Sequence, residues 1–513
     1  MIFLSRRAAL LQSNRMFRKV LVANRGEIAV RVIRALKELG IPSVAVYSDV
    51  DRAALHVRMA DEAAHIGPAA ASESYLRIDR VLDAARLHKA EAIHPGYGFL
   101  SENAAFAAAC EREGIVFIGP SAKSIESMGS KTGARELARN AGVPVVPGTE
   151  QGVGNITEAR EVAKQCGYPV MLKAAAGGGG KGMRRVDTEA GLESALREAS
   201  SEAERAFGNG EVYIEKLIVN PRHIEIQVLG DHHGNLIHLG ERECSIQRRH
   251  QKVIEECPSP FVAKHPELRQ KMGDAATMAA RAASYYNAGT VEFLVDQQGA
   301  FYFLEMNTRL QVEHPVTEMV TGLDLVHWQM RIAAGERLPF RQQDIAWRGS
   351  ALECRIYAED PDNHFFPSPG KITYLARPGG PGVRLDSGTY EGWTVPLEYD
   401  PLLAKMSVWA ETRDDAIARM IRAFEEYSVA GIKTNTAFFR QILDDAEFRA
   451  GNLHTGFIQE FFDRGRPPVT QERDLEAIAG LIALLHTNKP QAVADGRPQM
   501  TRWRRSGLDE VLR

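Results

Sequence analysis

Cysteine is scarce in this sequence, and no two cysteines stand at the spacing of a metal or redox motif. The five cysteines are Cys110, Cys166, Cys244, Cys257 and Cys354. They are odd in number, widely scattered and form no CxxC pair, which argues against a disulfide scaffold and a structural zinc site. The pattern favours a reducing compartment, so we expect a cytoplasmic protein.

Long apolar runs, a strong net charge and internal repeats are lacking too. No stretch is apolar over the length that spans a bilayer. The formal net charge is −3 over 513 residues, which gives no reason to expect nucleic acid or a membrane surface as a partner. Hydrophobic residues make up 44% and charged residues 25%, as in ordinary globular proteins. The length suggests about three domains.

The first fifteen residues contain Arg6, Arg7 and Arg15 but no acidic residue. Such a composition is compatible with a targeting segment. The alternative is an upstream start codon, with Met16 as the true start. We favour this second interpretation because a complete strand is predicted to begin at Phe17.

The dinucleotide fingerprint is missing from the first predicted βαβ unit. Residues 19–23 and 43–47 are predicted strands, and residues 28–39 have the apolar spacing of a helix, with Gly40 where a C-cap is expected. This order predicts a parallel sheet with helices on its faces. Only Gly26 is available in the first turn, so the GxGxxG pattern is absent.

A proline- and glycine-rich loop at residues 94–102 follows a further predicted strand, residues 91–94. Another strand is predicted at residues 115–118. Ligands of α/β proteins bind at such strand ends, which makes the loop a candidate binding element. A simple tight turn is the alternative interpretation.

A run of four glycines, Gly177 to Gly180, is followed by Lys181 and preceded by a predicted strand at residues 168–173. Backbone N–H groups of such a run can surround phosphates, and Lys173 adds positive charge. The run is not a Walker A motif, because no Gly-Lys-Ser/Thr ends it. A flexible surface loop is the alternative interpretation.

Acidic residues inside two later strands indicate a divalent metal. Glu292 and Glu305 flank a hairpin signal at residues 296–299. If Val295 pairs with Ala300, Glu292 lies opposite Phe303 and Glu305 is its diagonal neighbour, about 7–8 Å away.

Asn307 shares this face by period two, and Arg309 joins it if the strand continues. Two carboxylates and an amide oxygen suit Mg²⁺ or Mn²⁺. Without metal, the adjacent glutamates would repel and a pKa would rise. A purely structural salt bridge to Arg309 or a lysine is the alternative.

Residues 223–228 alternate strictly, with His223, Glu225 and Gln227 on one face, which predicts a strand of an antiparallel sheet. Further on, residues 349–357 are predicted to form a strand and residues 366–370 a turn. Residues 414–426 have the spacing of an amphipathic helix.

Six blocks in order resemble biotin carboxylase, a member of the ATP-grasp family, over residues 17–464. The blocks are residues 22–28, 94–102, 173–183, 247–252, 305–315 and 353–356. No single block is decisive, but their order over such a length is specific.

The resemblance implies a multidomain α/β and α+β fold. It implies a Rossmann-like pre-ATP-grasp domain at residues 16–130 and an ATP-grasp domain at 131–335, with a mobile glycine-loop lid at about 145–218. A mixed β domain is expected at 348–464. Residues 1–15 would be an extension and residues 465–513 a tail.

The resemblance also implies roles for individual residues. The residues expected to bind ATP are Lys131, Lys173, Gly179, Gly180, Glu215, Lys216, Ile218, His223, His250, Glu292 and Glu305. Two divalent metals would be held by Glu292, Glu305 and Asn307. Bicarbonate would be held by Lys252, Arg309, Gln311 and Val312. Arg355 and Tyr97 would contact biotin. The expected catalytic residues are Lys252, Arg309, Glu313 and Arg355.

The activity implied is ATP-dependent carboxylation of biotin with bicarbonate through carboxyphosphate. Glu313 would be the general base and Arg355 would stabilise the biotin enolate. No Met-Lys-Met attachment motif occurs, so we expect biotin to arrive on a separate carrier protein. A carboxyltransferase partner and a homodimer are expected from the family.

We expect the assembly to be acetyl-CoA carboxylase, with propionyl-CoA, other acyl-CoA or pyruvate carboxylases as alternatives. A ligase acting on another acceptor, such as an amine, and a catalytically silent scaffold are further alternatives. Residues 474–485 are predicted to be helical, and residues 503–513 resemble a segment of longer acyl-CoA carboxylase α chains. We therefore expect the tail after Arg464 to help dock the partner subunits.

Overall fold

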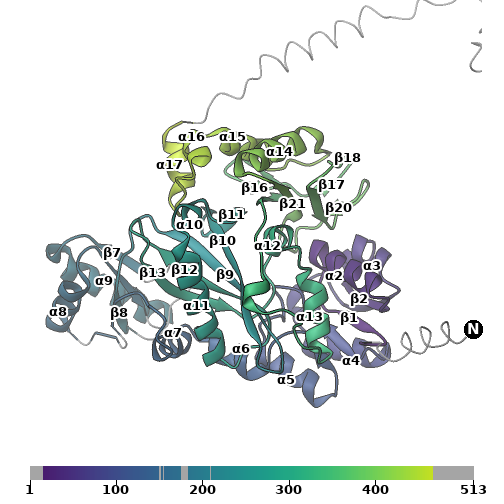
Figure 1. Ribbon diagram of the computed structural model, residues 1–513, viewed down its shortest axis with the longest axis horizontal. Helices are drawn as coiled ribbons and strands as arrows, with labels where there is room; N and C mark the ends of the chain where they lie inside the picture. Colours follow the sequence, from purple (N-terminus) through teal and green to yellow (C-terminus); the bar gives the residue numbers. More distant parts are fainter. Residues whose placement is uncertain (1–15, 150–151, 154, 175–182, 208–209, 466–513) are drawn as a thin grey trace, which may run out of the picture. The chain divides into compact units, whose positions relative to one another are not determined.

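The computed structural model describes residues 16–149, 152–153, 155–174, 183–207 and 210–465 (Figure 1). The sequence predictions that lie outside these residues are the extension 1–15, the glycine run with Gly179 and Gly180, and the tail, with its helix at 474–485 and its segment 503–513. Among the helices within these ranges, none combines the length and apolarity that crossing a bilayer requires.

The first strands form a five-stranded parallel sheet in the order β3-β2-β1-β4-β5. They are β1 (Val20–Val22), β2 (Ser43–Ser48), β3 (Glu62–Gly67), β4 (Ala92–His94) and β5 (Val116–Phe117). The helices around them are α2 (Gly26–Glu38), α3 (Leu55–Met59), α4 (Ile78–Leu87), α5 (Ala104–Arg112) and α6 (Ala122–Gly129). The predicted parallel sheet is confirmed, and Gly40 follows α2 with φ +69°, as its C-cap position predicts.

The order of this sheet reverses at β1, which lies between β2 and β4. Two loops therefore meet at one edge, one after β1 and one after β4. Asn24 joins them, because its Nδ2 donates to the carbonyls of Pro95 at 2.7 Å and Tyr97 at 2.8 Å. The 94–102 loop is thereby held at the switch point of the sheet.

An antiparallel sheet of eight strands carries most of the site, in the order β13-β12-β9-β10-β11-β14-β21-β19. Its strands are β9 (Arg222–Gly230), β10 (Leu236–Arg248), β11 (Gln251–Cys257), β12 (Asn287–Val295), β13 (Phe301–Asn307), β14 (Ser350–Tyr357), β19 (Val383–Ser387) and β21 (Leu402–Ala410). The predicted alternation of β9 is confirmed: Ile224, Ile226 and Val228 lie in the core that includes α11 (Glu267–Ala282). Figure 1 shows α11 beside β9 and β12.

The opposite face of this sheet is polar, yet it is buried. Helix α12 (His314–Thr321) packs on it across β10, β11, β14 and β21. Helix α13 (Leu325–Ala333) follows and packs against β12 and α2. Charged side chains on this face are therefore enclosed between sheet and helix, where each must find a partner.

The register of the β12–β13 hairpin differs from the prediction. Val295 pairs with Phe301 instead of Ala300, and a bulge at Leu304 brings Glu305 directly opposite Glu292. Phe303 and Glu305 have the same parity in the sequence, but Phe303 is in the core. The extra residue of the bulge reverses the alternation and places Glu305 on the polar face.

A smaller antiparallel sheet, in the order β7-β6-β8, contains β6 (Val170–Ala174), β7 (Met183–Val186) and β8 (Val212–Lys216). The helices near it are α7 (Lys131–Asn140), α8 (Ile156–Cys166) and α9 (Leu192–Phe207). Two single bridges tie the segment before α8 to both sheets, from Val145 to Phe303 and from Gly148 to Glu215.

Short elements complete the chain up to Arg464. The strands are β15 (Glu359–Asp360), β16 (Phe366–Pro367), β17 (Gly370–Lys371), β18 (Tyr374–Ala376), β20 (Thr394–Val395) and β22 (Ser428–Ala430). The helices are α10 (Pro260–Lys264), α14 (Arg413–Glu426), α15 (Thr436–Asp444), α16 (Ala446–Ala450) and α17 (Phe457–Asp463). The helix predicted at 414–426 and the strand at 349–357 are confirmed. Of the turn predicted at 366–370, only residues 368–369 lie outside strands, because β16 ends at Pro367 and β17 begins at Gly370. The predicted domain limits stay a prediction.

A close approach of two backbones joins β19 to α2. A Cβ atom added at Gly388 would lie 2.8 Å from the carbonyl carbon of Gly26 and 2.9 Å from the nitrogen of Glu27. Only glycine fits this distance, because neither backbone atom can rotate away. The contact sets the separation between α2 and β19, the strand that pairs with the one carrying Lys405.

We expect Gly388→Ala to lower the free energy of unfolding by about 1–3 kcal/mol, since overpacking against backbone forces the two elements apart. Denaturant unfolding followed by tryptophan fluorescence would measure the change. Gly379→Ala is the matched control, because its added Cβ has no neighbour within 4 Å. Equal stability of the two variants would contradict this interpretation of the contact.

Candidate active site

A single ammonium group joins three carboxylates on the polar face of the large sheet. Lys252 Nζ, at the start of β11, lies 2.5 Å from Glu225 Oε2, 2.8 Å from Glu292 Oε1 and 2.8 Å from Glu313 Oε1. These acids come from β9, β12 and the N-terminal end of α12. The three contacts fix the register of the strands and the position of the helix together.

A second cation, Arg242 of β10, lies completely buried beneath this cluster. Its Nε donates to Glu225 Oε1. Its remaining donors reach Gln227 Oε1 at 2.7 Å, Gln311 Oε1 at 2.6 Å, and the hydroxyls of Thr290 and Thr317 at 3.0 Å each. The sequence analysis assigned no role to Arg242, although the three consecutive charged residues at 241–243, with alternating sign, were a signal.

Glu292 is surrounded by donors. Its Oε1 accepts from Asn307 Nδ2 at 3.0 Å and Gln311 Nε2 at 2.7 Å, in addition to Lys252. His223 Nε2 lies 2.9 Å from its Oε2, while His223 Nδ1 accepts from Gln247 Nε2 at 2.9 Å.

The electrostatics of Glu292 correct one expectation. Burial favours the neutral acid, but the charges of Lys252 and His223 outweigh it and hold the pKa of Glu292 well below its usual value. At Glu292 the pKa therefore falls instead of rising, because Lys252 and His223 contact this carboxylate directly.

Glu313 and Arg355 form the second half of the cluster. Arg355 Nη2 donates to Glu313 Oε2 at 2.9 Å, and Arg355 Nε donates to Glu255 Oε1 at 2.6 Å. Burial raises the pKa of Glu313, but Lys252, Arg355 and Arg242 together hold that pKa well below the usual range. Glu313 is therefore an ionised carboxylate whose two oxygens each accept from a cation.

The predicted loop at 94–102 reaches the same region. Arg309 Nε donates to Glu102 Oε2 at 2.7 Å, and its Nη2 donates to Asn307 Oδ1 at 2.7 Å. Strand β13 ends at Asn307, so Arg309 lies in the segment after it, not on the strand.

Tyr97, in the same loop, donates its hydroxyl to Glu27 Oε1. Lys405 Nζ lies 3.4 Å from that oxygen and donates to the Val312 carbonyl at 2.6 Å. The loop, α2 and the segment before α12 thus meet at one buried lysine. Sequence reasoning assigned no role to Glu27 or Lys405.

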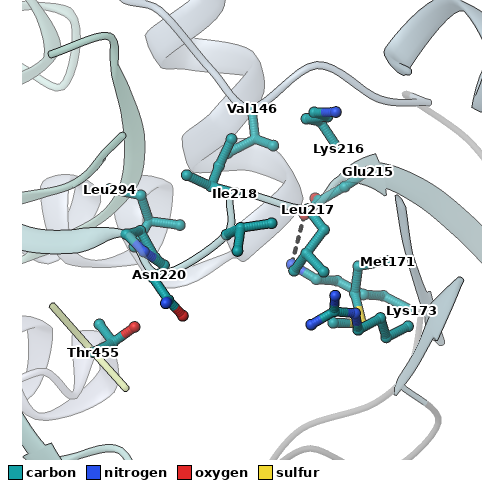
Figure 2. Close-up of a pocket in the computed structure, with 13 residues that line it drawn as sticks. Val146, Met171, Lys173, Glu215, Lys216, Leu217, Ile218, Asn220, Leu294 and Thr455 are labelled. Atoms are coloured by element: carbon teal, nitrogen blue, oxygen red, sulfur yellow. Dashed lines mark hydrogen bonds and ion pairs between the residues drawn. The ribbon is translucent and has the colours of Figure 1, made fainter. Parts of the chain in front are cut away.

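A separate pocket of about 320 Å³ lies between the small sheet and the large one (Figure 2). Predicted residues Lys173, Glu215, Lys216 and Ile218 are among its lining residues, together with Val146, Met171, Leu217 and Leu294. Lys173 Nζ donates to Glu215 Oε2 at 2.5 Å, the dashed contact in Figure 2. Lys216 donates its ammonium group to the carbonyls of Gly167 at 2.7 Å and Tyr168 at 3.1 Å.

Other predicted nucleotide residues are not brought to this pocket. His223 and His250 are not among the described lining residues. His223 lies in the acidic cluster, and His250 lies exposed in the turn between β10 and β11. Gly179 and Gly180 lie outside the described residues. Of Lys131 only the backbone is described, as the first residue of α7.

The donor set suits a hard divalent cation. Glu292 and Glu305 face one another across β12 and β13, with Asn307 on the same face. Nearby, ligand atoms of His223, Glu225 and Glu292 lie within 4.8 Å of one another. Carboxylate and amide oxygens in this arrangement fit Mg²⁺ or Mn²⁺. Asn307 Oδ1 accepts from Arg309, so a metal at that oxygen would compete with the guanidinium.

Comparison with protein families supports the resemblance to biotin carboxylase. Residues 16–125 match the family described as biotin carboxylase, N-terminal domain, and residues 353–460 match the biotin carboxylase C-terminal domain. Between them, residues 130–341 match the carbamoyl-phosphate synthase L chain, ATP binding domain. The fold and the acidic site together define an ATP-grasp enzyme.

Individual relatives are similar over nearly the whole described chain. A pyruvate carboxylase subunit of Methanothermobacter thermautotrophicus is 56% identical, over 87% of this chain and 90% of its own. "Biotin carboxylase" of Nostoc sp. is 54% identical, over 86% and 99%. A solved biotin carboxylase domain dimer of Hydrogenobacter thermophilus 2-oxoglutarate carboxylase, in complex with MgADP, ADP and bicarbonate, is 51% identical. It superposes with a TM-score of 0.80 over 87% of this chain and 98% of that chain.

The chain belongs to the biotin carboxylase family, and it is an ATP-dependent ligase of that type.

We expect Lys252→Met to lower the free energy of unfolding by about 3–5 kcal/mol near neutral pH, because three buried carboxylates lose a shared cation. The depressed pKa values of Glu292 and Glu313 give stability that is present above their usual value of 4.5 and lost as pH falls. The deficit of the variant should therefore shrink in acid. Urea unfolding across pH would measure it.

Lys433→Met is the control, since Lys433 pairs with Asp360 at the surface. A deficit of Lys252→Met that stays constant down to the lowest pH would refute the electrostatic explanation.

Proposed function

We propose that this chain carboxylates biotin on a separate carrier protein, using ATP and bicarbonate through carboxyphosphate. The observation that carries the proposal is the buried group of Lys252, Glu313 and Arg355, in which one carboxylate lies between two cations. Such a group can hold a small anion and take a proton from it. The identity of over 50% to a protein named biotin carboxylase adds support.

Bicarbonate would bind beside Lys252, Arg309, Gln311 and the backbone of Val312. An anion there competes for the same N–H donors that now contact Glu313. As those donors turn to the anion, the carboxylate of Glu313 loses their stabilisation and its pKa rises. Binding thereby converts a weak base into one able to take the bicarbonate proton.

ATP would occupy the pocket of Figure 2, with its base among Ile218, Leu217 and Leu294. Lys173 and the backbone of the glycine run would contact its phosphates, with Lys131, Gly179 and Gly180 as further expected contacts. His223 and His250 stay proposed nucleotide contacts. A pair of Mg²⁺ or Mn²⁺ ions on Glu292, Glu305 and Asn307 would neutralise charge that develops on the phosphates.

Biotin would lie beside Arg355 and Tyr97. Carboxyphosphate breaks down to CO₂ and phosphate, and the phosphate takes the ureido proton of biotin. The Arg355 guanidinium holds the oxyanion that forms on the ureido group. Carbon dioxide then bonds to the ureido nitrogen, and the proton leaves as hydrogen phosphate.

We expect Glu313→Gln to lower bicarbonate-dependent ADP release about 10²- to 10⁴-fold, the usual effect of losing a general base. Nucleotide binding should be retained, because Glu313 is not among the described residues that line the ATP pocket. ADP release by the wild type should need bicarbonate and increase with free biotin. Near-normal turnover of Glu313→Gln would mean that the base is another residue, and no release by the folded wild type would favour a silent scaffold.

Acetyl-CoA carboxylase is the assembly that we propose, with a carrier protein and a carboxyltransferase as partners and a homodimer of this chain. The relative named as part of a pyruvate carboxylase makes pyruvate the second candidate acceptor. The dimer proposal is supported by the Hydrogenobacter thermophilus domain, which was solved as a dimer.

We expect truncation after Arg464 to weaken co-purification of the carrier and transferase subunits at least several-fold, with ADP release on free biotin preserved. The full-length chain is the control in the same expression host. Supplying the purified assembly with acetyl-CoA, propionyl-CoA or pyruvate would then identify the acceptor. Unchanged co-purification would exclude a docking role for the tail.

A further inference from the structure

Two buried glutamates lie directly opposite one another beside Arg355. Glu255 of β11 pairs with Glu353 of β14 in the antiparallel register. Both have an exposed fraction of 0%. Directly paired residues have Cβ atoms about 4.5–5.5 Å apart, so the two carboxyl groups lie within reach of one another. Neither residue has a role in the proposed reaction.

Each carboxyl group has one oxygen with a partner and one without. Glu255 Oε1 accepts from Arg355 Nε at 2.6 Å, and Glu353 Oε2 accepts from Ser407 Oγ at 2.7 Å. Glu255 Oε2 and Glu353 Oε1 have no partner among the described residues, although both are buried. A buried oxygen without a donor is costly, so two such atoms on facing residues need an explanation.

The charges around the pair do not balance if every acid is ionised. On the Glu255 side stand Lys252, Glu313 and Arg355. Lys405 lies on the Glu353 side and also contacts Glu27. The phenol of Tyr97 faces Glu353 as well. Four carboxyl groups, those of Glu27, Glu255, Glu313 and Glu353, thus share the three cations Lys252, Arg355 and Lys405. Arg242 also lies near Glu313, but it pairs with Glu225. Asp386 faces Glu27 and Lys405, but it pairs with Arg384. Lys252 is moreover shared with Glu225 and Glu292.

One proton would remove both anomalies at once. A hydroxyl on Glu353 Oε1 can donate to Glu255 Oε2, which gives each orphaned oxygen a partner and removes one negative charge. Consistently, burial raises the pKa of Glu255 to about 7 and that of Glu353 to about 8. The protonated state belongs to the pair, since the two groups titrate together.

We infer that Glu353 and Glu255 share one proton, which keeps Glu255 oriented as the anchor of Arg355 and so positions the guanidinium for biotin. Glu353 and Glu255 are positioning residues, because they act through Arg355. The inference rests on the proposed function only for the identity of the group that Arg355 meets.

Three variants test the shared proton. Glu353→Gln keeps a neutral donor at the same place, Glu353→Ala removes it, and Glu243→Gln neutralises a different buried acid. Glu243 is a matched control because it accepts from Ser245 and Ser259 and burial raises its pKa to about 7. Bicarbonate-dependent ADP release is measured for each, without biotin and over a range of free biotin.

We expect Glu353→Ala to lower kcat/KM for biotin about 10- to 100-fold, the loss associated with one charge-assisted hydrogen bond. ADP release without biotin should change far less, since Arg355 acts on biotin. Glu353→Gln should restore kcat/KM for biotin to within a few-fold of the wild type. The biotin-dependent rate of the wild type should decline as pH rises through about 8, and this decline should be absent in Glu353→Gln.

Stability and infrared spectra give readouts that do not depend on activity. A raised carboxyl pKa gives native stability that is lost as pH rises from its usual value through the folded value. Glu353→Gln should therefore gain thermal stability over the wild type towards alkaline pH. The infrared difference spectrum between wild type and Glu353→Gln should contain the carbonyl stretch of a protonated carboxylic acid at neutral pH.

Several outcomes would overturn the inference. A difference spectrum with no acid band means that both glutamates are ionised and that water or another donor bridges them. A Glu353→Gln variant as impaired as Glu353→Ala means that the negative charge of Glu353 is needed. If the folded wild type released no ADP with bicarbonate, either with or without biotin, the result would instead contradict the proposed function and leave the spectroscopic result valid.

Discussion

The site depends on the ammonium of Lys252 and its three carboxylates. Removing a cation and three anions from water costs several kcal/mol for each ion, and only well-aligned contacts offset that cost. Glu225, Glu292 and Glu313 belong to two strands and a helix that are distant in the sequence. The ammonium of Lys252 contacts all three carboxylates only when β9 and β12 are in register and α12 lies across the sheet. One buried charge therefore specifies the positions of two strands and one helix.

The same requirement, that every buried charge has a partner, applies along the whole polar face of the large sheet. Its charges continue from Glu292 on β12 through Arg242 on β10 to Arg355 on β14 and Lys405 on β21. Helix α12 seals this row, and the opposite face of the same strands packs as an ordinary apolar core. Nucleotide chemistry and biotin chemistry are therefore proposed to occur on one rigid surface, with Glu313 between them.

Much of this architecture was predictable from local patterns. Spacing alone predicts the parallel βαβ units, the alternation of β9, and the position of Glu292 and Asn307 on one face of the sheet. Each of these signals lies within a short segment. The bulge at Leu304 was not predictable, since no glycine or turn residue marks it. Arg242, Glu255 and Glu353 were missed for a physical reason. A charge in an alternating strand normally indicates a solvated face, and their burial is decided by α12, which packs from outside their own segments.

The pairing of Glu313 with two cations has a consequence for selectivity. A neutral molecule cannot take the place of Lys252 and Arg355 as partners of the Glu313 carboxylate. It also cannot take the place of that carboxylate as the partner of the two cations. The entry of a neutral molecule would therefore leave buried charges unpaired. A small anion with several acceptor oxygens can take over the donors while Glu313 takes up a proton. In the proposed mechanism, the same exchange that admits the anion would therefore create the base that acts on it. Binding and proton transfer are linked by electrostatics, and a site without Glu313 would retain the attraction for anions but lose that coupling.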